Sequence, residues 1–345
     1  MNLAPTPRWY DLAVAYWCER DDMFVRRLKE YSAQNGVNLF VIEPLWLEDV
    51  LRKYEEQKLG IRVLLDLGSD PADPASPYTR LVLLAKQRGA QVINDPPAAA
   101  RFSHKGEAHH ALQAAGFPVP FGLVVTPGEA DNRTLTDEER LGLGETFFIK
   151  PCHGFGGQGV IGDAREIRDL HRSHAVFPDT HFLLKRRVEI AELAGQPAYW
   201  RVIYVLGEIH LCWWHPQTKS YRVVMQWQIE DFALWPLFEL GQRLATVTGL
   251  EFFSVEAARS PDNVYMLVDY VNEQIDLRPK SFSVDGVPDE LVRRIARRVT
   301  RFVEDQRPVW AVDRDLDSRE ERLLSIHERC RAAGRSWTTA TGAWN

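Results

Sequence analysis

An apolar, strand-like segment that runs directly into a glycine-rich loop is the feature that most restricts how this chain can fold. The segment ends at Lys150-Pro151, and the loop after it contains glycines at positions 154, 156, 157 and 159. Because such a loop has little side-chain bulk, its backbone N–H groups can approach an anion closely. Lys150 would add a compact positive charge beside it. The pattern therefore predicts a loop that holds a polyphosphate.

Two other phosphate-binding loops have similar letters. Gly154, Gly156 and Gly159 also satisfy the dinucleotide fingerprint, but that fingerprint requires the glycines to open a helix. Here the loop exits through Val160-Ile161-Gly162, which predicts a return strand and hence a hairpin flap with the loop at its tip. The P-loop pattern fails because no Lys-Ser or Lys-Thr follows the glycines. A glycine-rich hairpin that binds nothing stays open as an alternative.

Composition excludes several classes of protein. A chain of 345 residues is long enough for two or three modest domains, and its hydrophobic fraction of 45% is that of an ordinary globular protein. The net charge of −6 gives no support for a nucleic-acid or membrane-surface partner. No apolar run approaches the ~20 residues of a membrane span. The N-terminus shows no signal peptide, and widely spaced cysteines predict reduced thiols, so we expect a cytoplasmic protein.

The N-terminal part alternates strand and helix patterns, which predicts a small parallel α/β domain. The expected strands are Leu12–Trp17, Asn38–Glu43, Ile61–Leu67 and Gln91–Asn94, and the expected helices are Asp22–Asn35 and Tyr78–Arg88. Asp66, Ser69 and Asp70 follow the third strand, where open α/β sheets place ligand contacts. Plain turn chemistry is the competing interpretation of these residues.

The rest of the chain mixes helices with antiparallel strand patterns. We expect a helix from Ser103 to Ala115 with Ser103 as its N-cap, and a polar, turn-rich surface excursion at Gly128–Gly144. Later elements are predicted as strands at His181–Ile190 and Tyr199–Trp214, a helix at Pro236–Thr248, strands at Phe252–Ala257 and Val264–Val271, and an arginine-rich amphipathic helix over Leu291–Phe302. The pattern weakens after Pro308, although Ser318–Ala333 is compatible with a short helix.

Two strongly apolar strands each carry one carboxylate. Glu256 and Asp269 are thirteen positions apart (269 − 256), so a short turn would bring them side by side, where a cation must neutralise them. Asn272 follows closely. Two carboxylates and an amide oxygen, completed by substrate phosphates, form a common Mg²⁺ site. Two exposed carboxylates and a turn asparagine are the alternative.

The order of these motifs resembles the ATP-grasp superfamily, which includes glutathione synthetase, D-alanine–D-alanine ligase and the ribosomal-protein glutamate ligases. The resemblance runs from about Asn94 to Pro279 and includes NDPPAAARFSHKGEAHHALQAAGFPVP, which contains Lys105. It implies an α/β fold, with α+β character in the C-terminal part. A small parallel pre-ATP-grasp domain would precede two α+β subdomains with the nucleotide between them. The implied divisions are 1–95, 96–184 with the flap, 185–307 with the metal site, and 308–345 as a helix and tail.

The resemblance also assigns site residues. The nucleotide would be held by Lys105, Lys150, Gly154, Gly156, Gly157, Gly159, Lys185, Arg186, Val188 and Glu192, with Val188 in the adenine hinge and Glu192 at the ribose. The metal ligands would be Glu256, Asp269 and Asn272. Arg201 would meet the γ-phosphate or acyl-phosphate beside Lys150. Arg278 is a candidate for a substrate carboxylate, or else a surface arginine.

Two positions depart from the family pattern. The usual second metal strand reads E-x-N, whereas this chain has one more residue between Asp269 and Asn272. Either a β-bulge restores the alignment or one metal ligand is lost. The hinge around Lys185 is also unusually basic. Each departure bears on the roles of individual residues, and neither removes nucleotide binding.

The implied activity is an ATP-dependent carboxylate–amine ligase that forms an acyl-phosphate and releases ADP and phosphate. It would use ATP with Mg²⁺, or Mn²⁺, on small-molecule or peptide carboxylate and amine substrates, and a homodimer is common among the relatives. An ATP-grasp kinase, an ATP-binding protein that has lost catalysis, and a dinucleotide oxidoreductase are the alternatives. The aromatic residues Trp213, Trp214, His215, Tyr221 and Trp227 would form either a substrate pocket or packed core.

Overall fold

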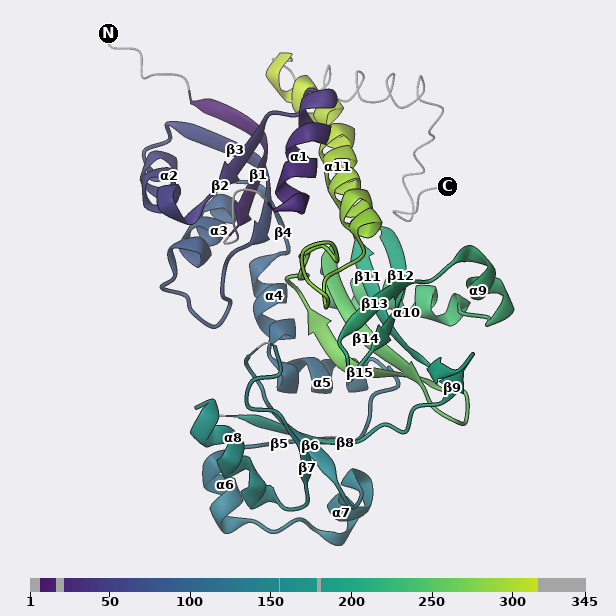
Figure 1. The fold of residues 1–345 in the computed structure, drawn as a ribbon. Helices are drawn as coiled ribbons and strands as arrows, with labels where there is room; N and C mark the ends of the chain where they lie inside the picture. The colour runs from purple at the N-terminus through teal and green to yellow at the C-terminus, as the bar shows by residue number, and fades with distance from the viewer. Residues whose placement is uncertain (1–6, 17–21, 155, 179–180, 316–345) are drawn as a thin grey trace, which may run out of the picture.

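The N-terminal part of the chain is a four-stranded parallel sheet flanked by helices (Figure 1). The computed structural model describes residues 7–16, 22–154, 156–178 and 181–315. The sheet has the order β2-β1-β3-β4. Its elements are β1 (Arg8–Tyr16), α1 (Met23–Gln34), β2 (Leu39–Ile42), a 3₁₀ turn at Pro44–Trp46, α2 (Leu47–Glu55), β3 (Leu59–Leu67), α3 (Pro77–Gln87) and β4 (Gln91–Ile93). The parallel α/β prediction is confirmed, and it holds because the apolar runs of β1 and β3 are buried on both faces.

Two helices connect this sheet to the rest of the molecule. They are α4 (Pro96–Ser103) and α5 (Lys105–Ala114). The prediction of Ser103 as the N-cap is wrong, because Ser103 ends α4 and the cap of α5 is His104. The Nδ1 atom of His104 accepts a hydrogen bond from Glu107 N at 3.0 Å. An imidazole nitrogen thus satisfies a free N–H of the first turn, a task that usually falls to a hydroxyl or carboxylate.

A second four-stranded sheet, with the order β5-β8-β6-β7, carries the glycine loop between β6 and β7. Its elements are β5 (Gly122–Val125), α6 (Pro127–Asn132), α7 (Asp137–Leu143), β6 (Phe147–Pro151), β7 (Ile161–Ala164), a 3₁₀ turn at Ile167–Asp169, α8 (Leu170–Val176) and β8 (Phe182–Arg186). The turn-rich surface excursion expected at Gly128–Gly144 contains two short helices, α6 and α7. Each helix starts with a capping box, Thr126 with Glu129 and Thr136 with Glu139.

The third and largest sheet is antiparallel, with the order β13-β12-β11-β14-β15. A β-hairpin, β9 (Glu192–Leu193) with β10 (Gln196–Pro197), precedes it. The large sheet and the helices between its strands are β11 (Tyr199–Val205), β12 (Glu208–His215), β13 (Ser220–Val223), α9 (Gln226–Asp231), α10 (Trp235–Thr248), β14 (Phe252–Arg259) and β15 (Tyr265–Asn272). The single run expected at Tyr199–Trp214 is two strands, because Leu206 and Gly207 turn the chain with positive φ.

Helices cover both faces of this large sheet. Apolar residues of α10 pack with one face, whereas α11 (Asp289–Asp315) packs with the other face and with α1 beside the N-terminal sheet (Figure 1). The amphipathic helix predicted over Leu291–Phe302 is confirmed. The helix runs past Pro308, where the sequence pattern weakens, and continues to Asp315. The helix proposed at 318–333 lies outside the described residues. No helix in the described part of the chain is long and apolar enough to cross a membrane.

Candidate active site

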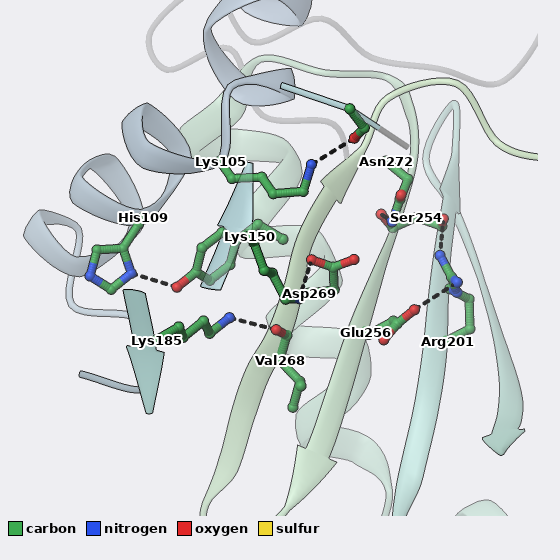
Figure 2. Close-up of polar contacts among 12 residues, drawn as sticks. Lys105, His109, Lys150, Lys185, Arg201, Ser254, Glu256, Val268, Asp269 and Asn272 are labelled. Atoms are coloured by element: carbon green, nitrogen blue, oxygen red, sulfur yellow. Dashed lines mark hydrogen bonds and ion pairs between the residues drawn. The ribbon is translucent and has the colours of Figure 1, made fainter. Parts of the chain in front are cut away.

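The two carboxylates predicted to pair do stand side by side. Across β11, β14 and β15, the residues Arg201, Glu256 and Asp269 occupy one row of the large sheet, since Arg201 pairs with Glu256 and Glu256 pairs with Asp269. Residues paired across neighbouring strands project from the same face. The sheet therefore presents one guanidinium and two carboxylates together on the face turned toward the glycine-loop sheet (Figure 2).

The extra residue between Asp269 and Asn272 is absorbed by an irregularity in the strand pairing. The register shifts between the Ser254/Asn272 pair and the Glu256/Asp269 pair, because these pairs are two residues apart along β14 but three residues apart along β15. The bulge that the sequence left as one of two outcomes is thus present. It places Asn272 opposite Ser254, and Asn272 Nδ2 lies 3.5 Å from the carbonyl oxygen of Ser254.

Arg201 and Tyr199 hold the carboxylate of Glu256 in place. Arg201 Nη2 lies 2.8 Å from Glu256 Oε1, and the hydroxyl of Tyr199 donates to Glu256 Oε2 at 2.5 Å. The side chains of Arg201 and Glu256 are only 12% and 14% exposed, so this ion pair is shielded from water. Burial and the charge of Glu256 raise the pKa of Tyr199 well above its ordinary value. Tyr199 therefore stays a hydrogen-bond donor to Glu256.

Lysines surround the second carboxylate. Lys150 Nζ lies 3.1 Å from Asp269 Oδ1, which links the end of β6 to β15 across the gap between the two sheets (Figure 2). Burial by itself would raise the pKa of Asp269, but the ammonium groups of Lys150, Lys105 and Lys185 outweigh it and hold that pKa well below its usual value. Asp269 is thus ionised, with more positive than negative charge around it.

The side chain of Lys185 lies in the interior, between β8 and β15. Its Nζ donates to the carbonyl oxygen of Val268 at 2.5 Å and lies 3.9 Å from the centre of the Tyr270 ring. Val268 is the extra residue at the second register shift of β15, so its carbonyl is available to a side chain. Burial and the nearby Lys150 charge lower the pKa of Lys185 well below its ordinary value. The hydroxyl of Tyr270 in turn contacts His109 Nδ1 at 2.5 Å.

The glycine loop has the backbone conformations that its composition predicts. Gly154, Gly156, Gly157 and Gly159 all have positive φ, and the loop joins two antiparallel strands, β6 and β7. The hairpin prediction is therefore confirmed. Lys105 Nζ donates to the carbonyl oxygen of Gly154 at 2.7 Å, and Ser173 of α8 contacts the carbonyl of Gly159. Lys105 thus holds the start of the loop, and Ser173 fixes its end to α8.

The remaining predicted residues are more exposed. Arg186 and Glu192 are exposed and Val188 is partly buried, along the segment that leaves β8 for the large sheet. Arg278 lies on the loop after β15 and binds carboxylates of this chain. Its Nη2 is 2.6 Å from Asp276 Oδ2 and 3.4 Å from Asp285 Oδ2. A substrate carboxylate would have to compete with both.

Turn chemistry accounts for the weaker candidate site at the end of β3. The carboxylate of Asp66 accepts hydrogen bonds from Gly68 N at 3.1 Å and Ser69 N at 2.9 Å, as a turn residue does. Gln274 Nε2, on the loop after β15, donates to the carbonyl oxygen of Ser69 at 2.5 Å. The end of β3 therefore lies beside the loop that follows the proposed metal strand. The carboxylate of Asp66, however, is hydrogen-bonded within its own turn.

Comparison with solved structures shows which fold this is. The chain resembles a RimK-domain ATP-grasp protein from Sphaerobacter thermophilus, with a TM-score of 0.59 and 19% identity over 84% of this chain and 98% of that one. It also resembles D-alanine–D-alanine ligase from Bacillus anthracis solved with ATP, with a TM-score of 0.58 and 11% identity over 86% and 98% of the two chains. A third similar structure is the ATP-grasp ligase PsnB, solved with the precursor peptide PsnA2 and AMPPNP. Its TM-score is 0.53, with 16% identity over 86% of this chain and 98% of that one. This chain has the ATP-grasp fold.

The ATP-grasp fold and the fold class predicted from the sequence are thereby confirmed. No protein-family model matches the sequence, and no curated protein matches it. At identities of 11–19% the solved structures establish the fold alone. The roles of individual residues and the domain boundaries stay predictions.

Within the ATP-grasp fold, sequence reasoning missed residues that support the predicted site. Tyr199 lies two positions before Arg201, so strand alternation alone would have placed both on one face. Asn94 was noted only as part of a motif. Its side chain accepts from Glu251 N and Phe252 N at 2.9 and 2.8 Å, and donates to the carbonyls of Phe252 and Glu273 at 2.7 and 2.9 Å. No local signal predicts such a distant set of partners.

Proposed function

We propose that the protein is an ATP-dependent carboxylate–amine ligase, which activates a carboxylate as an acyl-phosphate and releases ADP and phosphate. The observation that carries the proposal is the row of Arg201, Glu256 and Asp269, with Lys150 reaching it from the opposite sheet. This arrangement supplies cations and metal-type carboxylates at one place, beside a glycine loop. The ATP-grasp fold supports it, since structures that this chain resembles were solved with ATP, with AMPPNP, or with Mg and ADP.

The residues present fit a divalent cation. Glu256, Asp269 and Asn272 provide oxygen atoms, which hard cations such as Mg²⁺ or Mn²⁺ prefer. Asp269 is ionised, and both carboxylates are held by cations or a hydroxyl that a metal would partly replace. The described residues contain no cluster of three or more His, Cys, Asp or Glu that could hold a metal. We therefore assign only two carboxylates and one amide to the ion, with nucleotide phosphates as its remaining ligands.

The chemistry follows from charge. A substrate carboxylate must approach the γ-phosphate of ATP, and two anions meet only if their repulsion is neutralised. Arg201 and Lys150 supply fixed positive charge on the two sides of the gap, and the loop N–H groups would face the phosphates. A bound Mg²⁺ would add further neutralisation of the phosphates. Closing of the flap would exclude water from the acyl-phosphate until an amine attacks it.

The remaining roles extend the same arrangement. We assign Lys105, Lys185 and the four loop glycines to the nucleotide phosphates and base, Arg186 and Val188 to the adenine hinge, and Glu192 to the ribose. Lys185 is buried, and its ammonium group reaches from β8 to β15. Its side chain, as well as its backbone, therefore faces the gap between the sheets. Arg278 stays a candidate for the substrate carboxylate on condition that Asp276 or Asp285 releases it.

The test is ADP release over a matrix of carboxylates, each with and without amine acceptors. The expected result is ADP formation that requires one carboxylate and one amine and that falls at least 100-fold in Glu256→Ala and in Lys150→Ala. Arg168→Ala is the matched control, because Arg168 is an exposed arginine on the turn before α8. Amine-dependent turnover that survives both site substitutions would refute the residue assignment.

Two other outcomes would change the proposal. Acceptor-dependent ADP release that never requires an amine and leaves a stable phosphorylated product would identify a kinase. ATP binding without turnover for any acceptor would identify a nucleotide-binding protein that has lost catalysis. Mass spectrometry of the product separates the first case from a ligase, and calorimetric titration with AMPPNP and Mg²⁺ detects the second.

A further inference from the structure

A cavity of about 280 Å³ lies beside the row of charged residues, at the β12–β13 edge of the large sheet. Trp214 and Tyr221 form its apolar wall, with their ring centres 4.6 Å apart. Trp214 also contacts the row itself, because the guanidinium carbon of Arg201 lies 4.8 Å from its ring centre. Trp214 is therefore shared between the cavity and the arginine to which we assign the acyl-phosphate.

The polar side chains of the cavity include two cations and no carboxylate among the described residues. They are Gln196, His215, Ser220, Arg222 and Lys280. Among the described side chains, Gln196 Nε2 is buried with no hydrogen-bond partner, while its Oε1 accepts from Arg222. Lys280 Nζ uses one of its hydrogens on the carbonyl of Tyr221 at 2.7 Å. A buried amide N–H without a partner is unfavourable unless a ligand atom accepts from it.

The size and the charge of the cavity restrict its occupant. Pockets for drug-sized ligands begin at roughly 300 Å³, so this cavity fits one ring or a short branched chain. Its aromatic wall favours a planar apolar group. Its cationic rim and its unpaired donor favour an acid that also carries a hydrogen-bond acceptor, and they disfavour an amine.

We propose that this cavity binds the side chain of the carboxylate substrate, and that this substrate is an aromatic acid with a carbonyl acceptor near its ring. The proposal rests on the proposed function, because it assigns the cavity to the acid that Arg201 would meet. The ring packs on Trp214 and Tyr221, the acceptor takes the Nε2 hydrogen of Gln196, and the carboxylate extends past Trp214 toward Arg201.

The test compares three probes by calorimetry in the presence of Mg²⁺ and AMPPNP. They are N-acetylphenylalanine, N-acetylalanine, which lacks the ring, and N-acetylphenylalaninamide, which lacks the carboxylate. We expect N-acetylphenylalanine to bind at least 10-fold more tightly than either of the others. Equal affinity for the first two, tighter binding of the amide, or no binding of N-acetylphenylalanine would overturn the proposal.

Substitutions locate the binding. Ser220→Trp should fill the cavity and weaken N-acetylphenylalanine binding at least 10-fold. Gln217→Trp, at an exposed position of the same hairpin, should leave it within twofold. Gln196→Leu keeps the volume but removes the donor, and should weaken binding about 5-fold. An unchanged affinity in Ser220→Trp, with a melting temperature and near-UV circular dichroism like those of the wild type, would refute the site.

The same titrations separate this proposal from the proposed function. AMPPNP affinity is measured first for every variant. If AMPPNP binds and the ring-dependent preference is absent, the cavity assignment fails and the nucleotide site stands. If AMPPNP itself fails to bind, the proposed function fails, and the acid preference is then judged from titrations without nucleotide.

Discussion

At the scale of single residues, the site is organised by an excess of positive charge around Asp269. The ammonium groups of Lys105, Lys150 and Lys185 all act on this one carboxylate, and together they hold its pKa well below the usual range. Lys185 does so from an interior position in which its own pKa is lowered. Like charges gathered at one place destabilise the fold unless anions balance them. A polyphosphate in the gap between the sheets would supply those anions.

Substitution of Arg201 should show how much its charge, as distinct from its packing, contributes to activity. Arg201→Met keeps most of the packing against Trp214 but leaves Glu256 with only the Tyr199 hydroxyl among the partners described here. We expect kcat/KM for ADP release to fall on the order of 100-fold, because a fixed donor that faces developing charge contributes about that much. Arg201→Lys should recover part of the loss. Unchanged turnover in Arg201→Met would contradict the assignment.

His109 should make stability depend on pH in the acid range. Burial and the charge of Lys185 lower the pKa of His109 to about 4, whereas the unfolded chain takes up the proton near 6.5. Between these values the unfolded state binds more protons, so the free energy of unfolding falls as the pH drops from 6.5 to 4, by about 3 kcal/mol at most. Above pH 6.5 this residue contributes no pH dependence.

Urea unfolding at a series of pH values measures this effect. His109→Gln should show a smaller loss of stability between pH 6.5 and 4 than the wild type, whereas His110→Gln, on the exposed side of α5, should retain most of the loss, because the His110 charge lowers the pKa of His109 less than burial and Lys185 do. Identical slopes for His109→Gln and the wild type would show that another group is responsible.

At the scale of elements, the register shifts of β15 and the glycine hairpin both serve the site. The register shifts of β15 present Asp269 beside Glu256, place Asn272 opposite Ser254 and free the Val268 carbonyl for Lys185. The β6–β7 hairpin carries the glycines, whose positive φ values allow the backbone to curl without side chains. If β15 were regular, strand alternation would send one of Asp269 and Asn272 to the opposite face of the sheet. A regular strand in place of the glycine hairpin would likewise not curl in this way.

Gly159 is the position where the loop should tolerate a side chain least. An added Cβ would lie 2.8 Å from Phe177 Cβ and 2.9 Å from Pro151 Cγ, at a φ of +68°. Gly159→Ala should therefore lower the free energy of unfolding by about 2–3 kcal/mol and weaken nucleotide binding at least 5-fold. Gly157→Ala is the matched control, since its Cβ meets nothing within 4 Å and only the strain of its φ, about 1–2 kcal/mol, remains.

Calorimetric titration with AMPPNP and denaturant unfolding measure the two effects separately. If Gly159→Ala and Gly157→Ala behave alike in both measurements, the packing of the loop against Phe177 does not matter to the site.

At the scale of the whole molecule, one asparagine ties the N-terminal sheet to the large sheet. The side-chain amide of Asn94, directly after β4, forms four hydrogen bonds. They join it to the backbone at the start of β14 and to the residue after β15. Gln274 adds a second contact between the same two regions. The proposed metal strand is therefore fixed at its end by residues that follow strands of the N-terminal sheet.

Asn94→Ala should destabilise the molecule as a whole. Four hydrogen bonds at about 0.5–1.5 kcal/mol each would be lost at a position that is 4% exposed, so we expect a decrease of about 3 kcal/mol in the free energy of unfolding. Asn132→Ala, which removes one exposed contact on α6, should change it by less than about 0.5 kcal/mol. Denaturant unfolding measures both. A near-neutral Asn94→Ala would show that the two sheets are held by other contacts.

Local patterns in the sequence were enough to predict the alternating N-terminal sheet, the glycine hairpin and the pairing of Glu256 with Asp269. Each depends on neighbours within a few residues or on one short turn. The capping boxes at Thr126 and Thr136 were equally readable, and the turn-rich prediction for this segment missed the two helices that they start. Ser103 failed as a cap for another reason, because it is the last residue of α4, and His104 caps α5 instead.

The tertiary structure alone decided which charges meet. Sequence could not show that Arg201 binds Glu256 while Lys150 binds Asp269, or that Lys185 turns into the interior. The reason is physical. Backbone conformation and strand pairing across a short turn respond to local residues, whereas ion pairing and burial depend on groups that lie as many as 119 positions apart in the chain and meet only after the sheets have packed.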